Sequence, residues 1–475
     1  MSTALEPPPS PAPRRGPIPL GLAVRLARLA GRAARATGRG GTSLPGKLLT
    51  RLRPDAIAAM SSRIEHGSVV LSATNGKTTT AALVASILER HGETLVHNRQ
   101  GANMAGGIAA TLIGDWRRGR PTGSTGLFEV DEFWLAGLVR DLRPRALLLA
   151  NLFRDQLDRY GELETIVDRW RAMVEDPANA GVRLVLGADD PAVADLGLGR
   201  EACYFGVQDT SVALPGLEHA ADATTCRVCG SAYDYAATFV GHLGHYACPQ
   251  CGHARPQPQV TAERIVLDGT RGSVVLLRID GVEVEVALRL PGLYNVYNAL
   301  GAAALCHVLG VPATTIAAGL ESTSAAFGRA ETVEVEGHPL QLLLVKNPAG
   351  ANEVARTLAL ADEPVDLLAI LNDRVADGRD VSWVWDADLE RLAPQVRRVT
   401  CGGTRAAEMA VRWKYAGVPV DRIAVVEHDV AGALDAAVAA LPSADAPLHA
   451  IPTYTAMLEL REELVRRGAA RGSFA

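Results

Sequence analysis

The sequence of 475 residues lacks several features that would assign it to other classes of protein. It has no uninterrupted apolar run of about 18 residues, so no segment is expected to span a membrane. Its N-terminus carries prolines and arginines but no apolar core of a secretory signal, which predicts a cytoplasmic protein. The net charge is only −5, which argues against a dedicated nucleic-acid binder. The length allows two or three domains.

Acidic residues are also absent from the segment 18–53, which is rich in arginine. Within it, Leu22, Leu26 and Leu29 recur at helical spacing. We therefore expect an N-terminal segment, residues 1–54, with a Pro-rich beginning and a basic helix. Packing of this helix on the next domain is the preferred interpretation, because an Ala-rich helix has modest apolar anchors. Contact of its basic face with anionic lipid is the alternative.

Short apolar runs that predict buried strands alternate with helical patterns from residue 68 onward. In the first unit these runs lie at 69–71, 146–150 and 183–187, with a helix over 78–91 and strand-like alternation over 264–290. In the second unit they lie at 342–345, 367–371 and 423–426. The pattern predicts an α/β fold with a central domain, residues 55–330, and a Rossmann-like C-terminal domain, residues 331–475.

The stretch LSATNGKTTT, residues 71–80, contains the Gly-Lys-Thr core of a phosphate-binding loop. Leu71 stands where the usual pattern has its first glycine, but the predicted strand–turn–helix context favours a nucleotide site over a solvated turn. Lys77 would neutralise the outer phosphates, and the Thr78 hydroxyl would hold Mg²⁺. The expected ATP-binding residues of this loop are Asn75, Gly76, Lys77, Thr78 and Thr79.

A second short apolar stretch, LFEVDE at residues 127–132, ends in carboxylates. A carboxylate at a strand end can bind the metal ion that bridges the phosphates, and Glu129 is the candidate ligand for Mg²⁺. The alternative is an ordinary charged end of a strand.

Four of the seven cysteines form two tight pairs, whose spacing is C-x₂-C-x₁₈-C-x₂-C. These are Cys226, Cys229, Cys248 and Cys251. Four thiolates in two pairs suit tetrahedral Zn²⁺ and leave no position for water, so we expect a structural zinc ribbon in an insert, residues 222–256. The other three cysteines, Cys203, Cys306 and Cys401, are expected to be structural.

Four motifs in this order resemble the Mur ligase family, the ATP-dependent amide-bond synthetases of peptidoglycan assembly. They are TNGKT at 74–78, Glu129, DQLD at 155–158 and YNVYN at 294–298, and FGRAE at 327–331 resembles the family's arginine-bearing link. The resemblance implies a central ATPase domain that uses ATP and Mg²⁺. It places Asn295 at the adenine, and Arg329 and Lys346 near the ribose and phosphates.

The sequence also departs from the family pattern. Gln156 replaces a metal-binding histidine, Arg171 or a neighbour replaces a lysine that becomes carbamylated, and Tyr294 replaces the histidine of its motif. Too few residues precede the phosphate loop to form the family's UDP-sugar-binding domain. These departures weigh against the alternative of a conventional Mur or folylpolyglutamate-type ligase that adds an amino acid.

The four-cysteine insert and the stretch DGRDVSWVWD, residues 377–386, resemble more narrowly a branch of the family that amidates lipid II. That resemblance implies an acyl phosphate on the α-carboxyl of D-glutamate in the stem peptide. Ammonia would come from a separate, GatD-like glutaminase bound by the C-terminal domain, at the inner face of the membrane. A zinc-ribbon interaction protein with a regulatory nucleotide site is the alternative from another class.

In this branch the C-terminal domain supplies an aspartate that completes the partner's Cys–His pair. Asp377 is the first candidate, because an acidic turn could project it outward, followed by Asp380 and Asp386. Trp383 and Trp385 alternate in a strand pattern and are expected in the core.

Overall fold

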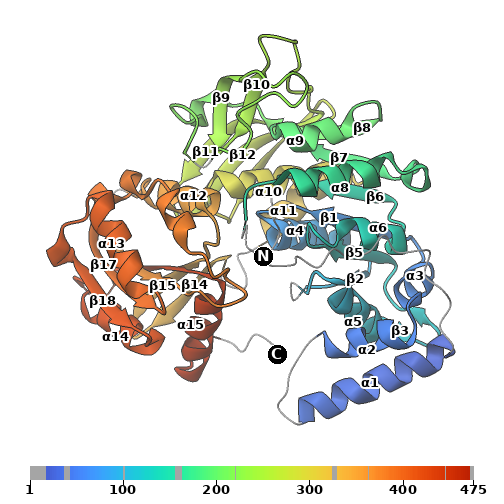
Figure 1. The fold of residues 1–475 in the computed structure, drawn as a ribbon, viewed down its shortest axis with the longest axis horizontal. Helices are drawn as coiled ribbons and strands as arrows, with labels where there is room; N and C mark the ends of the chain where they lie inside the picture. Colours follow the sequence, from blue (N-terminus) through green and yellow to red (C-terminus); the bar gives the residue numbers. More distant parts are fainter. Residues whose placement is uncertain are drawn as a thin grey trace, which may run out of the picture.

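The computed structural model describes residues 18–36, 43–99, 102–155, 163–219, 221–323, 329–361, 363–443 and 445–470. Two α/β domains, each built on its own sheet, lie side by side in Figure 1. No helix of the described part is long and apolar enough to cross a bilayer.

The sheet of the central domain has nine strands in the order β13-β12-β11-β8-β7-β6-β1-β5-β2. Its parallel part consists of β1 (Ser68–Ser72), β2 (Leu95–His97), β5 (Thr125–Glu129), β6 (Ala146–Leu149), β7 (Arg183–Gly187) and β8 (Ala202–Val207). Strand β11 (Val260–Asp268) pairs parallel with β8, and β12 (Gly272–Ile279) and β13 (Val282–Leu288) continue the sheet antiparallel. The predicted strands at 69–71 and 183–187 are confirmed, and the one at 146–150 is confirmed to Leu149.

Helices cover both faces of this sheet because its central strands are apolar on both sides. Val69 and Leu71 point into one core, whereas Val70 points into the other. The first core is closed by α4 (Lys77–Arg90), α10 (Leu293–Val308) and α11 (Ala313–Ser322). The second is closed by α1 (Leu20–Ala36), α3 (Ala56–Ser61), α5 (Ala105–Asp115), α6 (Leu135–Leu142) and α8 (Leu163–Glu175), with α2 (Leu44–Leu52) between α1 and α5.

The C-terminal domain has a six-stranded sheet in the order β14-β15-β19-β16-β17-β18. Its strands are β14 (Arg329–Val335), β15 (His338–Leu343), β16 (Val365–Ile370), β17 (Val396–Gly403), β18 (Ile423–Glu427) and β19 (Leu448–Pro452). Its helices are α12 (Pro348–Leu358), α13 (Ala406–Ala416), α14 (Val430–Ala439) and α15 (Tyr454–Arg466). The strand expected at 342–345 begins four residues earlier and ends at Leu343, so Lys346 lies in the loop that follows.

A small antiparallel hairpin, β9 (Asp234–Val240) and β10 (Leu243–Ala247), forms the cysteine-bearing insert between β8 and β11. It stands at the upper edge of the molecule in Figure 1. A separate small cluster of Cys226, Tyr233, Tyr246 and Cys248 forms its core.

Candidate functional site

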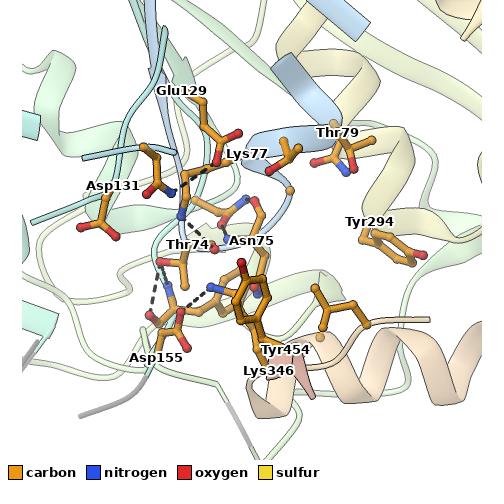
Figure 2. Close-up of a pocket in the computed structure, with 18 of the residues that line it drawn as sticks. Thr74, Asn75, Lys77, Thr79, Glu129, Asp131, Asp155, Tyr294, Lys346 and Tyr454 are labelled. Atoms are coloured by element: carbon orange, nitrogen blue, oxygen red, sulfur yellow. Dashed lines mark hydrogen bonds and ion pairs between the residues drawn. The ribbon is translucent and has the colours of Figure 1, made fainter. Parts of the chain in front are cut away.

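A cavity of about 510 Å³ lies where the phosphate loop faces the C-terminal domain. The central domain lines it with the loop 74–79, the carboxylates after β5 and the beginning of α10. The C-terminal domain lines it with Lys346, the first turns of α12 and the beginning of α15. Figure 2 shows Lys77, Glu129 and Asp155 on one side of this space, with Tyr294 across from them.

The phosphate loop runs from the end of β1 to the first turn of α4. Gly76 has φ +85°, and a Cβ there would lie 1.9 Å from Oδ1 of Asn298, so only glycine fits. Asn151 fixes the loop, because its Oδ1 accepts from the Asn75 backbone N–H at 2.9 Å and its Nδ2 donates to the Asn75 carbonyl at 3.1 Å. The loop therefore presents the N-terminus of α4 to the cavity, as an anion site requires.

Lys77 is buried at the base of this loop, and its Nζ lies 2.7 Å from Oε2 of Glu132. Burial opposes the charged form of Lys77, but the carboxylates of Glu132, Asp131 and Glu129 outweigh it and raise the pKa of the lysine. Burial likewise opposes the charge on Glu132, and Lys77 and Lys346 outweigh it and lower the pKa of that carboxyl. Both groups are thus charged near neutral pH, and a bound phosphate would compete with Glu132 for the lysine.

Glu129 is held by two asparagines that the sequence did not single out. Asn98 accepts from the Glu129 N–H at 3.0 Å and donates to its carbonyl at 2.8 Å, and Nδ2 of Asn103 lies 3.4 Å from Oε1. Glu129, Asp131 and Glu132 line the cavity together with Thr78. Carboxylate and hydroxyl oxygens are the ligands that Mg²⁺ prefers, so this donor set fits the expected ion.

Other predicted site residues are placed less completely. Asn295 is buried at the cavity, donating to the Pro291 carbonyl at 2.7 Å and accepting from Asn298 at 2.9 Å. Arg329 begins β14, but its side chain lies outside the described residues, as does the whole of Gln156. Arg171 lies on α8 and is not among the residues that line the cavity.

The four paired cysteines come together at one end of the β9–β10 hairpin, with all their Sγ atoms within 4.8 Å of one another. Sγ of Cys226 lies 3.6 Å from that of Cys251, and Sγ of Cys229 lies 3.4 Å from that of Cys248. A tetrahedral site with Zn–S distances of about 2.3 Å has S···S edges of about 3.8 Å, so the cluster fits zinc. The nearby His253 is engaged by Tyr233 and Asp195 instead.

Comparison with known proteins agrees with this geometry. The family model of the Mur ligase middle domain matches residues 72–248, and that of the MurT ligase C-terminal domain matches residues 344–457. The chain is 32% identical to the MurT subunit of lipid II isoglutaminyl synthase of Staphylococcus aureus (strain N315), over 94% of this chain and 97% of that protein. It is 33% identical to the MurT subunit of Streptococcus pneumoniae, over 95% and 99%.

The chain belongs to the MurT branch of the Mur ligase family. Its fold also matches more distant ligases. A pseudomurein peptide ligase type C from Methanothermus fervidus aligns with a TM-score of 0.65 and 21% identity, covering 87% of this chain and 81% of that one. The MurF ligase of Thermotoga maritima, solved with ADP, aligns with a TM-score of 0.60 and 14% identity, covering 90% and 85%.

The remaining cysteines of this MurT-family chain are structural, as the sequence predicted. Cys306 and Cys401 are fully buried, and burial raises the pKa of each thiol well above its usual value. Burial also raises the pKa of Cys203 to about 11. None of these thiols offers the thiolate that a glutaminase nucleophile needs.

The expectation that Asp377 projects outward is wrong. Asp377 is 5% exposed, and its carboxylate accepts hydrogen bonds from the backbone N–H of Thr455, at 2.7 Å, and from the Thr455 hydroxyl. These bonds tie the loop after β16 to the first turn of α15. Asp380 is exposed instead, accepting from the Ser382 N–H at 2.9 Å, and its hydrogen bonds with Ser382 lower its pKa. Asp386 is also exposed.

The two tryptophans of this region also differ from expectation. They lie in a short 3₁₀ helix, Ser382–Trp385, rather than in a strand. Trp385 is 50% exposed and Trp383 is half-buried, so neither is a full member of the core.

Proposed function

We propose that this chain is the synthetase subunit of a lipid II isoglutaminyl synthase. It activates the α-carboxyl of the stem-peptide D-glutamate with ATP and amidates it to D-isoglutamine. The observation that carries the proposal is the cavity, in which a phosphate loop, the carboxylates of Glu129, Asp131 and Glu132, and a C-terminal domain of the MurT type face one another.

The activation step needs charge stabilisation more than covalent chemistry from the protein. A carboxylate oxygen of the substrate attacks the γ-phosphorus, the bond to the β–γ bridging oxygen breaks, and ADP leaves. Lys77 and the N–H groups at the beginning of α4 stabilise the charge on the transferring phosphoryl group. Thr78, Glu129 and the neighbouring carboxylates would hold Mg²⁺, which supplies further neutralisation of the phosphates.

In the second step ammonia attacks the acyl carbon, and the C–O bond to phosphate breaks. One proton leaves the attacking nitrogen, so amide and inorganic phosphate are the products. Ammonia would come from a GatD-like glutaminase, because the three cysteines outside the four-cysteine cluster have raised pKa values and offer no activated thiol. Among the acidic side chains of 377–386, Asp380 suits the partner's Cys–His pair better than Asp377, since it is exposed and carries a lowered pKa.

The four-cysteine cluster would hold a structural zinc. None of its members lines the cavity, so it has no direct part in the reaction. Metal analysis of the purified chain should give about one zinc per molecule, since four thiolates complete one tetrahedral shell. A chain that folds fully without zinc would contradict this part of the proposal.

The decisive experiment supplies the purified chain with ATP, Mg²⁺, ammonium and a soluble stem-peptide substrate. We expect ADP, phosphate and a product that is lighter than its substrate by the difference between OH and NH₂. Addition of an amino acid would indicate a conventional Mur ligase. The proposal is contradicted if the chain binds nucleotide but forms no product, either with ammonium or with the glutaminase present. Such a result would indicate an interaction protein.

A further inference from the structure

The helix α1 buries only one of its faces. Ala23, Val24 and Ala27 are at most 1% exposed and belong to the core beneath the central sheet. Through them α1 packs on α2 and α5. In Figure 1 α1 runs along the lower edge of the molecule, with α2 and α5 on its inner side. The small residues thus hold the helix, which confirms the expected packing on the neighbouring domain.

The opposite face of α1 carries three large apolar side chains in solvent. Leu22 is 49% exposed, Leu26 39% and Leu29 59%. Their spacing of four and three residues places them on one face of the helix, and we call them the leucine ridge. Because the inner face already holds α1 in place, the fold does not need these leucines.

Arginine side chains border the leucine ridge. Arg25 and Arg32 are exposed on α1, and Arg117 is exposed on the short hairpin beside it. Arg28 joins the helix to this hairpin by donating to the carbonyls of Ile113, at 2.7 Å, and Trp116. Burial lowers the pKa of Arg28, and the charges of Arg117 and Arg32 lower it further, so these three cations lie close together. Within the described ranges neither Arg25, Arg32 nor Arg117 has a carboxylate partner.

We propose that the outer face of α1 docks on an anionic lipid bilayer. The leucine ridge would enter the boundary between headgroups and acyl chains, while Arg25, Arg32 and Arg117 meet lipid phosphates. An apolar ridge with a border of positive charge fits such a surface, because the lipid phosphates supply the opposite charge.

The position of α1 also links this surface to the cavity. Ser43, just before α2, and Met104, just before α5, both line the cavity, and α1 packs on both of these helices. One layer of helices therefore separates the docked face from the site. This step rests on the proposed function, because a lipid-linked substrate would keep its lipid in the bilayer while its peptide enters the cavity.

The test is co-sedimentation of the full chain with phosphatidylcholine vesicles, with and without phosphatidylglycerol. We expect the chain to sediment with the anionic vesicles only and to be released by salt. Replacing the ridge by Leu22→Gln, Leu26→Gln and Leu29→Gln should lower binding about tenfold, and Arg25→Gln with Arg32→Gln should weaken it as well. The matched control replaces three leucines that are exposed elsewhere, Leu198, Leu217 and Leu360, by glutamine and should bind as the unchanged chain does.

The proposal fails if the unchanged chain stays in solution with anionic vesicles, or if the ridge variant sediments equally well. It also fails if the ridge variant loses a glutaminase partner but keeps its vesicle binding, because the face is then a protein interface. Amidation of a soluble stem peptide should be unchanged in the ridge variant, whereas amidation of lipid II in vesicles should fall. If the unchanged chain does not amidate the soluble peptide, the proposed function is refuted. Docking of α1 on lipid is still tested independently by the co-sedimentation experiment.

Discussion

The ammonium group of Lys346 forms an ion pair with the carboxylate of Asp155, which joins the C-terminal domain to the central domain at the cavity. The next residue extends this link. Nδ2 of Asn347 donates to Oδ1 of Asn75 in the phosphate loop at 3.0 Å, and Oδ1 of Asn347 caps α12 by accepting from Gly350 at 2.9 Å. The two domains therefore meet at the cavity through this ion pair and through a hydrogen bond from Asn347 to the phosphate loop.

Replacing Lys346 by methionine should impair the synthetase step itself. Burial raises the pKa of Asp155, and the positive charge of Lys346 opposes this rise. Loss of the Lys346 ammonium group therefore leaves the Asp155 carboxylate without a cation beside it. We expect kcat/KM for ATP to fall roughly 10- to 100-fold, from the loss of a charged hydrogen bond worth about 1.5–3 kcal/mol. The loss should be equal with ammonium and with glutamine. Lys414→Met, an exposed lysine on α13, is the control; equal activity of both variants would contradict the role of the pair.

The phosphate loop should be tested at Thr78 rather than at Lys77 alone. Lys77→Ala should abolish amidation, but it also leaves Glu132 buried without its partner, which costs about 3–5 kcal/mol. Loss of activity in that variant therefore does not separate ATP turnover from folding. Thr78→Val removes only a hydroxyl at the cavity, so amidation should fall roughly 100-fold with unfolding free energy within about 0.5 kcal/mol. An active Thr78→Val enzyme would exclude Thr78 as a metal ligand.

Local chemistry explains which parts of the site could be predicted from the sequence. Gly76, Lys77 and the four cysteines belong to contiguous motifs in which spacing encodes geometry, and all of them are where the motifs require. Asn98 and Asn103 carry no motif, and Asn151, which precedes the DQLD motif, reaches the phosphate loop through hydrogen bonds to a segment far away in the sequence. Their role is visible only once β1, β5 and β6 are side by side.

The fold shows the same limit. Buried central strands are continuous apolar runs, so β1 and β7 could be recognised, whereas the three-residue β2 and the edge strand β14 could not. Asp377 was misplaced because an acidic turn looks exposed in sequence. Its hydrogen bonds to Thr455, which is 78 residues away, are a tertiary contact that no local pattern reveals.

The roles of Asp380 and Asp377 can be distinguished by measuring amidation with glutamine and with ammonium as the nitrogen source. Asp380→Asn should lower glutamine-dependent amidation roughly 100-fold or more while sparing ammonium-dependent amidation, because an aspartate that orients a catalytic histidine acts only on glutamine hydrolysis. Asp377→Asn should instead loosen the first turn of α15 and lower the melting temperature, since it weakens two buried hydrogen bonds. If Asp377→Asn alone blocks glutamine use at full stability, Asp377 rather than Asp380 is the aspartate that this chain supplies to the partner's Cys–His pair.

Glu353 on α12 gives the chain a stability that depends on pH. It is 2% exposed, and burial raises the pKa of its carboxyl from 4.5 to about 7. Between these values the folded chain keeps a proton that the unfolded chain has released, so stability falls as pH rises through this range. The fall in the free energy of unfolding is complete just above about pH 7 and amounts to on the order of 3 kcal/mol.

Glu353→Gln should remove this dependence, because the amide is neutral at every pH and has nearly the same shape. In urea unfolding, the free energy of unfolding of the unchanged chain should therefore fall between pH 5 and pH 8 relative to that of the variant. At pH 8 the variant should be the more stable protein. Glu363→Gln, at an exposed glutamate beyond the end of α12, is the control and should follow the unchanged chain at both values. If stability depends on pH in the same way for Glu353→Gln and for the unchanged chain from pH 5 to 8, Glu353 is already charged in the folded state across this range. Arg356, whose Nη1 lies 3.7 Å from Oε1 of Glu353, must then stabilise that charge.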